Sequence, residues 1–384
     1  AQGTLVDTFS SLAEARDAIR EMKNGSGLPQ GGVTVNVRGG TYPLLSGSFA
    51  LEEQDSGTAD SPILYRAYNG EEVNYVGNIS VDGSKFTAVE DESVRQRLGS
   101  AADEVLVYDL AANNGLTEFA PIPKNGYGWP AQASAMSISV DGEAQTLARY
   151  PNTGFLTISS IQQTGFVPRD HVANPDGTCP ACTTEFGNGE RIMCQYGESA
   201  FLSQPGGIFT VNDTALHDKY SLWSQESDIW IAGCFCWDWA DDNCSVESVE
   251  DTGDGLKITT DDPTRYGFKG SGRRFYAYNL LCEIDEPGEW YLDRENAKLY
   301  LYPKNDLTDS SVDLAMQTEP LFMLDDVSYV DIQALNFSNA NGYGIRMEDC
   351  DHVEIAGCDF SDLGLRAVCM GTPEDSSMEA INTG

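Results

Sequence analysis

Positively charged residues are scarce in this sequence of 384 residues. Lysine and arginine total 23, against 60 aspartates and glutamates, which gives a formal charge of −37. Such a surface repels phosphate backbones, which argues against nucleic-acid partners. It also disfavours polyanionic glycans unless a cation bridges the contact, so a neutral ligand is expected. Solubility in a salty medium, where charge is screened over about 8 Å, explains the acidity without any partner.

Long apolar runs are missing as well. No stretch approaches the roughly eighteen consecutive apolar residues of a membrane-spanning helix, so no span is expected. The few histidines (His171, His217 and His352) are widely spaced, which argues against a Ser-His-Asp site. No GxGxxG or phosphate-binding loop occurs, so nucleotide binding has no support.

Cysteine, in contrast, is abundant. An even count of 10, with seven between positions 179 and 282, predicts disulfides in an oxidising compartment. Zinc is the competing interpretation at Cys179-Pro-Ala-Cys182, but no second matched CxxC follows. Cys358 is expected in a buried repeat position instead. The ten are Cys179, Cys182, Cys194, Cys234, Cys236, Cys244, Cys282, Cys350, Cys358 and Cys369.

Five N-x-S/T sequons accompany the cysteines. We expect glycans at Asn24 and Asn78, which are predicted in polar loops, and at Asn212 and Asn243, but not at Asn336 between apolar strand residues. The start at Ala1-Gln2, without Met or a leader, fits the mature form of a secreted protein. The sequence therefore predicts an extracellular or cell-surface glycoprotein.

Strand patterns dominate, and a single helix is convincing. It is predicted over 11–23, with a serine cap, an apolar face at helical spacing and Gly25 as a stop. Alternating apolar residues predict strands at 33–37, 63–67 and 136–140. Asp141-Gly142 predicts a hairpin turn, and 290–301 predicts another hairpin.

Apolar residues near the C-terminal end recur at a fixed step of 23 residues. A short repeat with three β-patterned runs is typical of a parallel β-helix coil, whose inward residues stack on the next coil. The matched positions are Phe322/Ile345, Leu324/Met347, Val330/Val353, Ile332/Ile355, Leu335/Cys358 and Phe337/Phe360, and the first two pairs continue to Val368 and Met370.

From this repeat we expect an all-β fold: a right-handed parallel β-helix of the pectin-lyase-like kind, with one short N-terminal helix. The repeat disappears in the middle of the chain, where most cysteines lie. Three parts are therefore predicted: 1–80 with the helix and first coils, 81–310 as an inserted β-sandwich-like, disulfide-bonded lobe, and 311–384 with coils that continue past the end of the sequence.

Several sequence blocks give the chain a resemblance to secreted parallel β-helix proteins of the carbohydrate-active type, including glycoside hydrolases. They are FSSLAEARDAIR (9–20), VNVRGGTY (35–42), DSGT (55–58), PILYRAY (62–68), ARYPN (148–152), PGEWYLDR (287–294) and LYLYP (299–303). The resemblance implies a glycan or polysaccharide partner and first coils followed by an inserted lobe. This chain departs from the group in its cysteine-rich stretch. In the group, the catalytic carboxylates lie on later coils than those visible in this sequence.

Acidic residues of the repeat are the candidate catalytic groups. Glycoside cleavage needs two carboxyl groups about 5 to 10 Å apart. The 23-residue step stacks Asp325 and Asp326 under Glu348 and Asp349, and Asp326, Asp349 and Glu348 are the predicted acids. Acids so close could instead hold calcium, although no cofactor is required by the sequence. Solvated turns, where aspartate is common, are the alternative.

Aromatic residues of the middle region are the candidate substrate contacts. Trp237 and Trp239 flank Asp238 and could form a platform for the apolar face of pyranose rings. Core packing is the alternative. Arg149 and Tyr150 either orient a substrate or lock the lobe onto the rest of the chain.

Two functions remain open on the sequence alone. The first is a secreted glycoside hydrolase-like enzyme acting on neutral extracellular glycans. The second is a non-catalytic structural or adhesive glycoprotein that uses the repeat as a rigid scaffold, with self-assembly or matrix partners.

Overall fold

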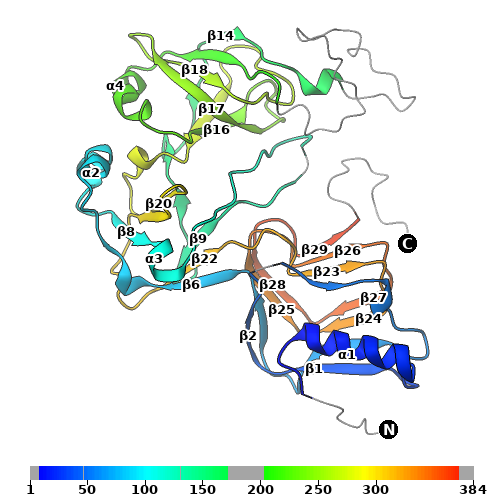
Figure 1. Ribbon diagram of the computed structural model, residues 1–384. Coiled ribbons are helices and arrows are strands. Elements are labelled where there is room, and N and C mark those ends of the chain that lie inside the picture. The colour runs from blue at the N-terminus through cyan, green and yellow to red at the C-terminus, as the bar shows by residue number, and fades with distance from the viewer. Residues whose placement is uncertain (1–7, 46, 130, 172–202, 372–384) are drawn as a thin grey trace.

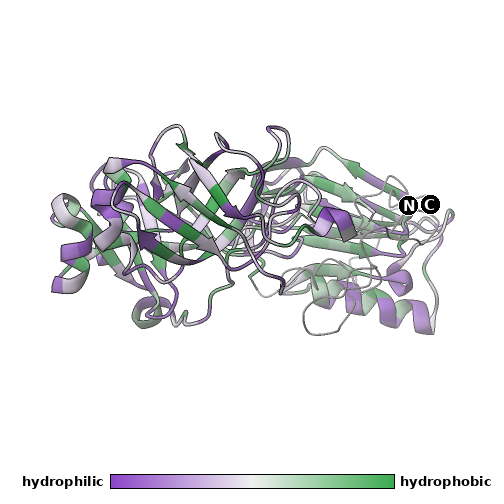
Figure 2. Cartoon of the chain, turned by 90° about the horizontal axis from the view of Figure 1, so that it is seen from above, coloured by the Kyte–Doolittle hydropathy of each residue, from purple (hydrophilic) through white to green (hydrophobic). Residues whose placement is uncertain are grey.

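The computed structural model describes residues 8–45, 47–129, 131–171 and 203–371. The chain forms an elongated, two-part molecule, in which parallel strands lie at one end and an antiparallel lobe at the other (Figure 1). The perpendicular view shows the same elongation, with hydrophilic residues prominent on the helices and green apolar stretches along the strands (Figure 2). In the part of the chain that is described, no helix is both long and apolar enough to cross a membrane.

Helix α1 (Leu12–Gly25) forms as predicted. The Ser11 side chain accepts a hydrogen bond from the Glu14 amide, which caps the first turn. Its buried face carries Ala15 and Ile19, and Ile19 belongs to the core of the parallel part. The helix is tied down because Arg20 makes two hydrogen bonds, of 2.7 and 2.6 Å, to the buried Asp55 carboxylate.

Three parallel sheets, each of four strands, form the part of the molecule beside α1. The first contains β1 (Val33–Val37), β4 (Ile63–Ala67), β24 (Ser328–Gln333) and β27 (Asp351–Ala356). The second contains β2 (Gly40–Pro43), β5 (Val73–Val76), β25 (Asn336–Ala340) and β28 (Asp359–Leu363). The third contains β3 (Phe49–Leu51), β23 (Phe322–Asp325), β26 (Ile345–Glu348) and β29 (Val368–Met370).

The 23-residue register is confirmed in these sheets. Phe322 pairs with Ile345, which pairs with Val368, and Ile332 pairs with Ile355 in parallel strands. The same parallel ladder extends backwards across the insertion, because Phe322 also pairs with Phe49. One buried apolar cluster runs through all three sheets, so the repeated side chains share a single core.

Three further sheets, built largely from antiparallel pairs, make up the middle of the chain. One joins β6 (Asn78–Asp82), β22 (Ser311–Ala315), β9 (Ser137–Val140) and β10 (Glu143–Ala144). Another joins β7 (Thr87–Ala88), β8 (Leu106–Asp109), β21 (Lys298–Leu301), β20 (Glu289–Asp293) and β11 (Thr146–Leu147). Helices α2 (Glu92–Leu98) and α3 (Leu110–Asn114) belong to the same stretch of chain.

The third of these sheets has eight strands, seven along its path and β13 beside it, and with α4 (Thr214–Trp223) it is called the antiparallel lobe below. Its core includes Phe209, Trp223, Ile231 and Phe275. Its strands are β14 (Ser160–Gln163), β15 (Ile208–Val211), β18 (Leu256–Thr260), β17 (Asp242–Asp251), β16 (Trp230–Cys234), β19 (Arg274–Tyr278) and β12 (Arg149–Tyr150), with β13 (Leu156–Thr157) also paired to β19.

The expected fold class, an all-β right-handed parallel β-helix, is wrong for this chain. The described residues form a mostly β structure with several parallel and antiparallel sheets, and no solenoid is assigned. The parallel sheets take their strands from two distant chain segments, and antiparallel pairing prevails between them. Alternating runs separated by tight turns, such as Asp141-Gly142 with positive φ at both residues, close into hairpins. The single-helix expectation also fails, since four α-helices are present in the described ranges.

The expected disulfides are absent among the described cysteines. Cys234, Cys236, Cys244 and Cys282 of the predicted disulfide region are free, as are the three near the C-terminal end. Cys244 and Cys282 belong to the core of the antiparallel lobe, where they pack as small apolar side chains. Cys358 packs against the core of the parallel sheets, as predicted for an inward position. Cys179, Cys182 and Cys194 lie outside the described residues.

Thiol labelling should distinguish these environments. Cys244 is fully buried, and burial raises its pKa well above the usual thiol range, so iodoacetamide should leave it unmodified in the native protein. In guanidinium without reductant it should be alkylated completely, as mass spectrometry of its peptide would detect. A Cys244 peptide that is alkylated only after reduction would contradict the free-thiol assignment.

The sequons differ in accessibility. The predicted polar loops are wrong for Asn24, which is exposed in the last turn of α1, and for Asn78, which lies in β6. The Asn78 amide is buried and donates to Asp313 Oδ1 at 3.0 Å, and that of buried Asn243 donates to the Pro123 carbonyl and the Tyr278 hydroxyl. A glycan at either nitrogen would break these contacts. Asn24 and the exposed Asn212 therefore stay as predicted acceptors.

Glu289 at the start of β20 should make stability depend on pH. Burial raises its pKa to about 7, despite hydrogen bonds from the amides of Asp285 and Glu286. The pKa of Glu289 in the folded protein exceeds the unfolded value of 4.5, so folding favours the protonated carboxyl group. The stability that this group contributes is complete below about pH 4.5 and is lost as the pH rises through 7. Between pH 5 and pH 8 the free energy of unfolding of the wild type should fall by about 2 kcal/mol relative to that of Glu289→Gln.

Urea unfolding at pH 5, 6, 7 and 8 measures this difference. Glu295→Gln, at an exposed position of the turn that follows β20, is the matched control and should track wild type at every pH. Parallel curves for wild type and Glu289→Gln would show that Glu289 does not titrate in this range.

Candidate functional site

Four aromatic side chains gather on the surface of the antiparallel lobe. Trp239 makes edge-to-face contacts with Tyr127 and Tyr266, at centroid separations of 5.1 and 5.4 Å. The rings of Trp237 and Trp239 are nearly parallel, with 5° between their planes and 6.5 Å between their centroids. Trp237, Trp239 and Tyr127 are 49%, 57% and 52% exposed. These four residues are called the aromatic platform.

The exposure of these rings decides between core packing and a surface position, which the sequence left open for Trp237 and Trp239. The apolar surface of Trp237 and Trp239 faces solvent, so these residues are not part of the lobe core. Large rings held in water cost free energy unless a ligand or partner covers them. The platform therefore has the features of a contact surface.

The platform residues come from three loops. Trp237 and Trp239 lie between the end of β16 and the start of β17, while Tyr127 and Tyr266 come from distant segments. The Tyr127 amide donates to the Asp241 carbonyl at 2.8 Å, and a bridge joins Gly126 to Asp242, which aligns that loop with the start of β17. Gly126 has a φ of 140° and its backbone lies against that of Asp242, so a side chain would not fit there.

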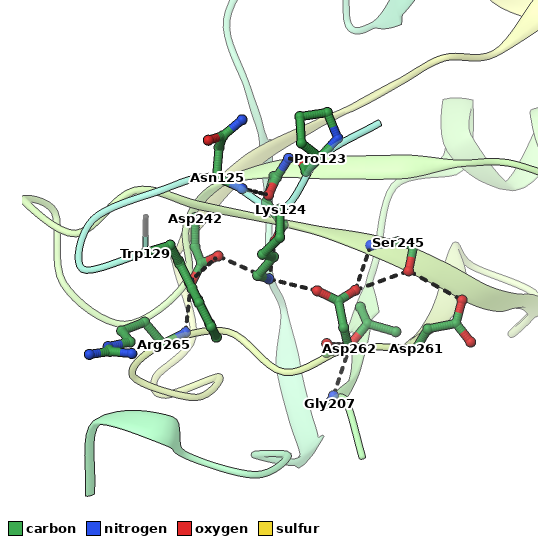
Figure 3. Close-up of polar contacts among 12 residues, drawn as sticks. Pro123, Lys124, Asn125, Trp129, Gly207, Asp242, Ser245, Asp261, Asp262 and Arg265 are labelled. Carbon is green, nitrogen blue, oxygen red and sulfur yellow. Dashed lines mark hydrogen bonds and ion pairs between the residues drawn. The ribbon is translucent and has the colours of Figure 1, made fainter. Parts of the chain in front are cut away.

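A buried ionic network lies beside these loops (Figure 3). The ammonium group of Lys124, only 4% exposed, is 3.0 Å from Asp242 Oδ1 and 2.8 Å from Asp262 Oδ2. It also donates to the carbonyl oxygen of Asn243. Burial by itself lowers the pKa of Lys124, but the carboxylates of Asp242 and Asp262 outweigh burial and raise it.

The same network fixes the loops that carry the platform. Trp129 Nε1 donates to both carboxylate oxygens of Asp242 at 3.1 Å, and the Arg265 amide donates to Asp242 Oδ2 at 2.5 Å. Although burial raises the pKa of Asp242, these donors favour the carboxylate form. Trp129 and Arg265 are close neighbours in sequence of Tyr127 and Tyr266, so Asp242 joins two of the loops that carry the platform. Figure 3 shows its contacts with Trp129 and Arg265.

Arg149 and Tyr150, the other predicted contacts, lie on β12. Arg149 holds its own loop, donating to the carbonyls of Pro151 and Gly154 at 3.0 and 2.9 Å, and its guanidinium lies 3.8 Å from the Tyr276 ring centroid. Tyr150 is half-buried against Trp223 of the lobe core. Tyr150 thus packs as a lobe residue, while Arg149 borders the surface.

Of the predicted catalytic acids, Asp326 and Asp349 follow strands of the third parallel sheet, and Glu348 ends β26. Asp326 and Asp349 both have positive φ, of 54° and 48°, and both are exposed in the turns after β23 and β26. The Asp326 amide donates to the Glu348 carbonyl at 2.9 Å, so the two turns are stacked as predicted. Glu348 forms an ion pair with Arg346 on its own strand. The catalytic assignment of these acids stays a prediction.

Metal binding has no preformed site in the described chain, where no three His, Cys, Asp or Glu side chains are placed to share an ion. An open hollow of about 460 Å³ lies on a different sheet from the platform, beside the ion pair of Lys298 with Asp109. None of the predicted site residues lines it.

Sequence reasoning missed the residues that support and complete the platform. Lys124, Asp242 and Asp262 lie in irregular segments or at a strand end, so no periodicity marks them as buried. Tyr127 could have been found, because Asn-Gly-Tyr-Gly-Trp at 125–129 combines turn glycines with aromatics.

Comparison with known proteins gives a fold relationship only. No family model matches the chain, and no curated protein matches it. A solved structure described as "Glycoside hydrolase" superposes on 94% of this chain and 60% of its own, with a TM-score of 0.55 and 18% sequence identity. This chain is similar to it in fold. A second structure, XylC in complex with xylose, covers 91% of this chain and 38% of its own at 11% identity, but its TM-score of 0.30 carries no argument.

This chain therefore spans about 60% of the length of the glycoside hydrolase structure that it resembles. That structure's description names a glycoside hydrolase and not a β-helix, in line with the correction of the fold class above.

Proposed function

We propose that this chain is a carbohydrate-active protein that binds extracellular glycans through the aromatic platform. The observation that carries the proposal is the exposure of Trp237, Trp239 and Tyr127 above a buried network that positions their loops. Tryptophan and tyrosine rings offer a flat apolar face with a polar edge, which suits the C–H face of a pyranose ring. The fold relationship to a glycoside hydrolase supports the same ligand class.

Rigidity strengthens this assignment. A ligand-binding surface loses less entropy on binding when its side chains are already held. The edge-to-face contacts of Trp239 with Tyr127 and Tyr266 and the hydrogen bonds of Asp242 restrict these rings before a ligand arrives. Secretion belongs to the proposal, and it rests on the exposed sequons at Asn24 and Asn212.

The binding test uses the whole chain with neutral polysaccharides as probes, namely cellulose, xylan, laminarin and galactomannan. Trp239→Ala should weaken binding to the preferred polysaccharide about tenfold, because a central ring of the platform is lost. Trp239→Phe should retain part of the affinity. Affinity electrophoresis gives the dissociation constants, and urea unfolding shows whether each variant is folded.

Tyr68→Ala is the matched control, since Tyr68 is 39% exposed but lies after β4 in the parallel part. It should bind as wild type does. Binding that is equal in wild type and Trp239→Ala, or no binding of any neutral or acidic glycan, would refute the proposal.

Hydrolysis is the second part of the proposal, and the stacked turns of Asp326 and Asp349 are its basis. Two carboxyl groups on adjacent turns could act as the general acid and as the base or nucleophile of glycoside hydrolysis. Asp349→Asn should abolish release of reducing sugar from the polysaccharide that the platform binds, with binding unchanged. Binding without turnover in wild type would favour the scaffold or adhesive role.

A further inference from the structure

Positive charge is concentrated in one short stretch of this acidic chain. Residues 263–282 contain Arg265, Lys269, Arg273 and Arg274 but no aspartate or glutamate, in a chain with 60 acidic residues. The stretch passes through β19 at the surface of the antiparallel lobe. The charge of this stretch of sequence is therefore opposite in sign to that of the whole chain.

Two arginines and two aromatic rings meet beside β19. The Arg274 guanidinium lies 5.5 Å from the ring centroid of Phe155, and that of Arg149 lies 3.8 Å from the centroid of Tyr276. Phe155 and Tyr276 are themselves 6.3 Å apart. Strand pairing explains the cluster, since β12 and β13 both pair with β19. These four residues are called the arginine–aromatic cluster.

The cluster is open to solvent at Arg274 and Phe155, whereas Arg149 already donates to the carbonyls of Pro151 and Gly154. Phe155 is 52% exposed and Arg274 is exposed. Within the described ranges no carboxylate lies at ion-pair distance from Arg149 or Arg274, whereas the adjacent Arg273 pairs with Asp238 at 3.2 Å. Guanidinium groups without a carboxylate partner in the described ranges are unexpected where acids outnumber bases by 60 to 23.

We propose that the arginine–aromatic cluster binds an acidic sugar residue, through its carboxylate or sulfate group. A guanidinium fork matches the planar carboxylate and the sulfate oxygens with two parallel hydrogen bonds. Phe155 and Tyr276 would contact the apolar face of the same sugar. This inference rests on the proposed glycan-binding function and changes its substrate class, from neutral glycans to glycans that carry acidic groups.

The charge of −37 does not oppose this recognition at physiological salt. Exposed charges are screened beyond about 8 Å, so an acidic group in the cluster is governed by the nearby arginines. At low ionic strength the repulsion from the whole molecule extends further. Affinity for an acidic glycan should therefore be weaker at 10 mM than at 150 mM salt, the reverse of simple ion-pair binding.

Matched pairs of polysaccharides test the proposal with the whole chain. The probes are κ-carrageenan with its desulfated form, and polygalacturonate with its methyl ester. Wild type should bind at least one acidic form about tenfold more tightly than its neutral partner. Arg274→Gln should remove this preference, Phe155→Ala should weaken binding to both forms, and Arg274→Lys should restore only part of the preference, because it keeps the charge without the fork.

Arg66→Gln is the control, because it removes one exposed charge from β4 of the parallel part. It should leave the preference intact. A preference for the sulfated form alone assigns a sulfate ligand, and one for the carboxylated form alone assigns a uronate. If no acidic form is preferred, or if Arg274→Gln behaves as wild type, the inference is overturned. If neutral glycans bind through Trp239 in that case, the proposed function still stands. If no glycan binds at all, the proposed function fails together with the inference.

Discussion

Replacing Lys124 with methionine is expected to lower the free energy of unfolding of the antiparallel lobe by about 3 to 5 kcal/mol. The substitution keeps a chain of similar length but removes the cation that lies 3.0 and 2.8 Å from Asp242 and Asp262. Two buried carboxylates would then lack their shared positive partner, and the low-polarity surroundings make that costly. Urea unfolding monitored by tryptophan fluorescence measures the loss.

The control is the same substitution at Lys257, whose ion pair with Glu250 is exposed on the same lobe. Lys257→Met should cost less than about 1 kcal/mol, because solvent screens that pair. The double variant Lys124→Met, Asp242→Asn should cost less than the sum of its single variants, since it removes one unpaired charge. A Lys124→Met variant as stable as Lys257→Met would show that the buried network does not support the lobe.

Replacing Phe337 with alanine is expected to destabilise the parallel part by about 3 to 5 kcal/mol. Phe337 is fully buried in β25, where its ring stacks on Phe360 at 5.1 Å and meets Phe322 edge-to-face at 4.9 Å. Tyr75 of β5 stacks on its other side at 6.0 Å. Truncation would leave a cavity between three rings that stacked strands hold apart.

Phe337→Leu should cost less than Phe337→Ala, because it fills part of the cavity. Phe155→Ala, at a ring that is 52% exposed, should change stability by no more than about 0.5 kcal/mol. Chemical unfolding of the three variants in parallel gives the comparison. Equal losses for Phe337→Ala and Phe155→Ala would contradict the stacked core.

Local sequence patterns predicted the local structure well. Ser11 and the apolar spacing of 12–22 predicted α1, and the Asp141-Gly142 pair predicted the turn between β9 and β10. The step of 23 residues predicted which residues pair in parallel strands. Each of these signals depends either on interactions between residues close in sequence or on a strict period. Both kinds of signal are visible in the amino-acid sequence itself.

Burial and exposure of single side chains were harder to predict. Trp237 and Trp239 fit a core and a surface equally well in sequence, because tryptophan occurs in both. The cysteine count predicted disulfides, yet buried Cys244 and Cys282 lie in the core as thiols. Composition reports how many such residues exist, whereas their surroundings depend on which strands come together.

The sequence by itself determined the charge of the chain, its strand-rich character and the parallel register of its repeated segments. Tertiary structure alone decided that antiparallel sheets would prevail between those segments, that Lys124 would be buried between Asp242 and Asp262, and that Arg149 would lie over the Tyr276 ring. The physical reason is sequence separation. Lys124 and Asp262 are 138 residues apart, and Arg149 and Tyr276 are 127 apart, so no local pattern links them. Their proximity follows from pairing between distant strands, and the candidate site is made there.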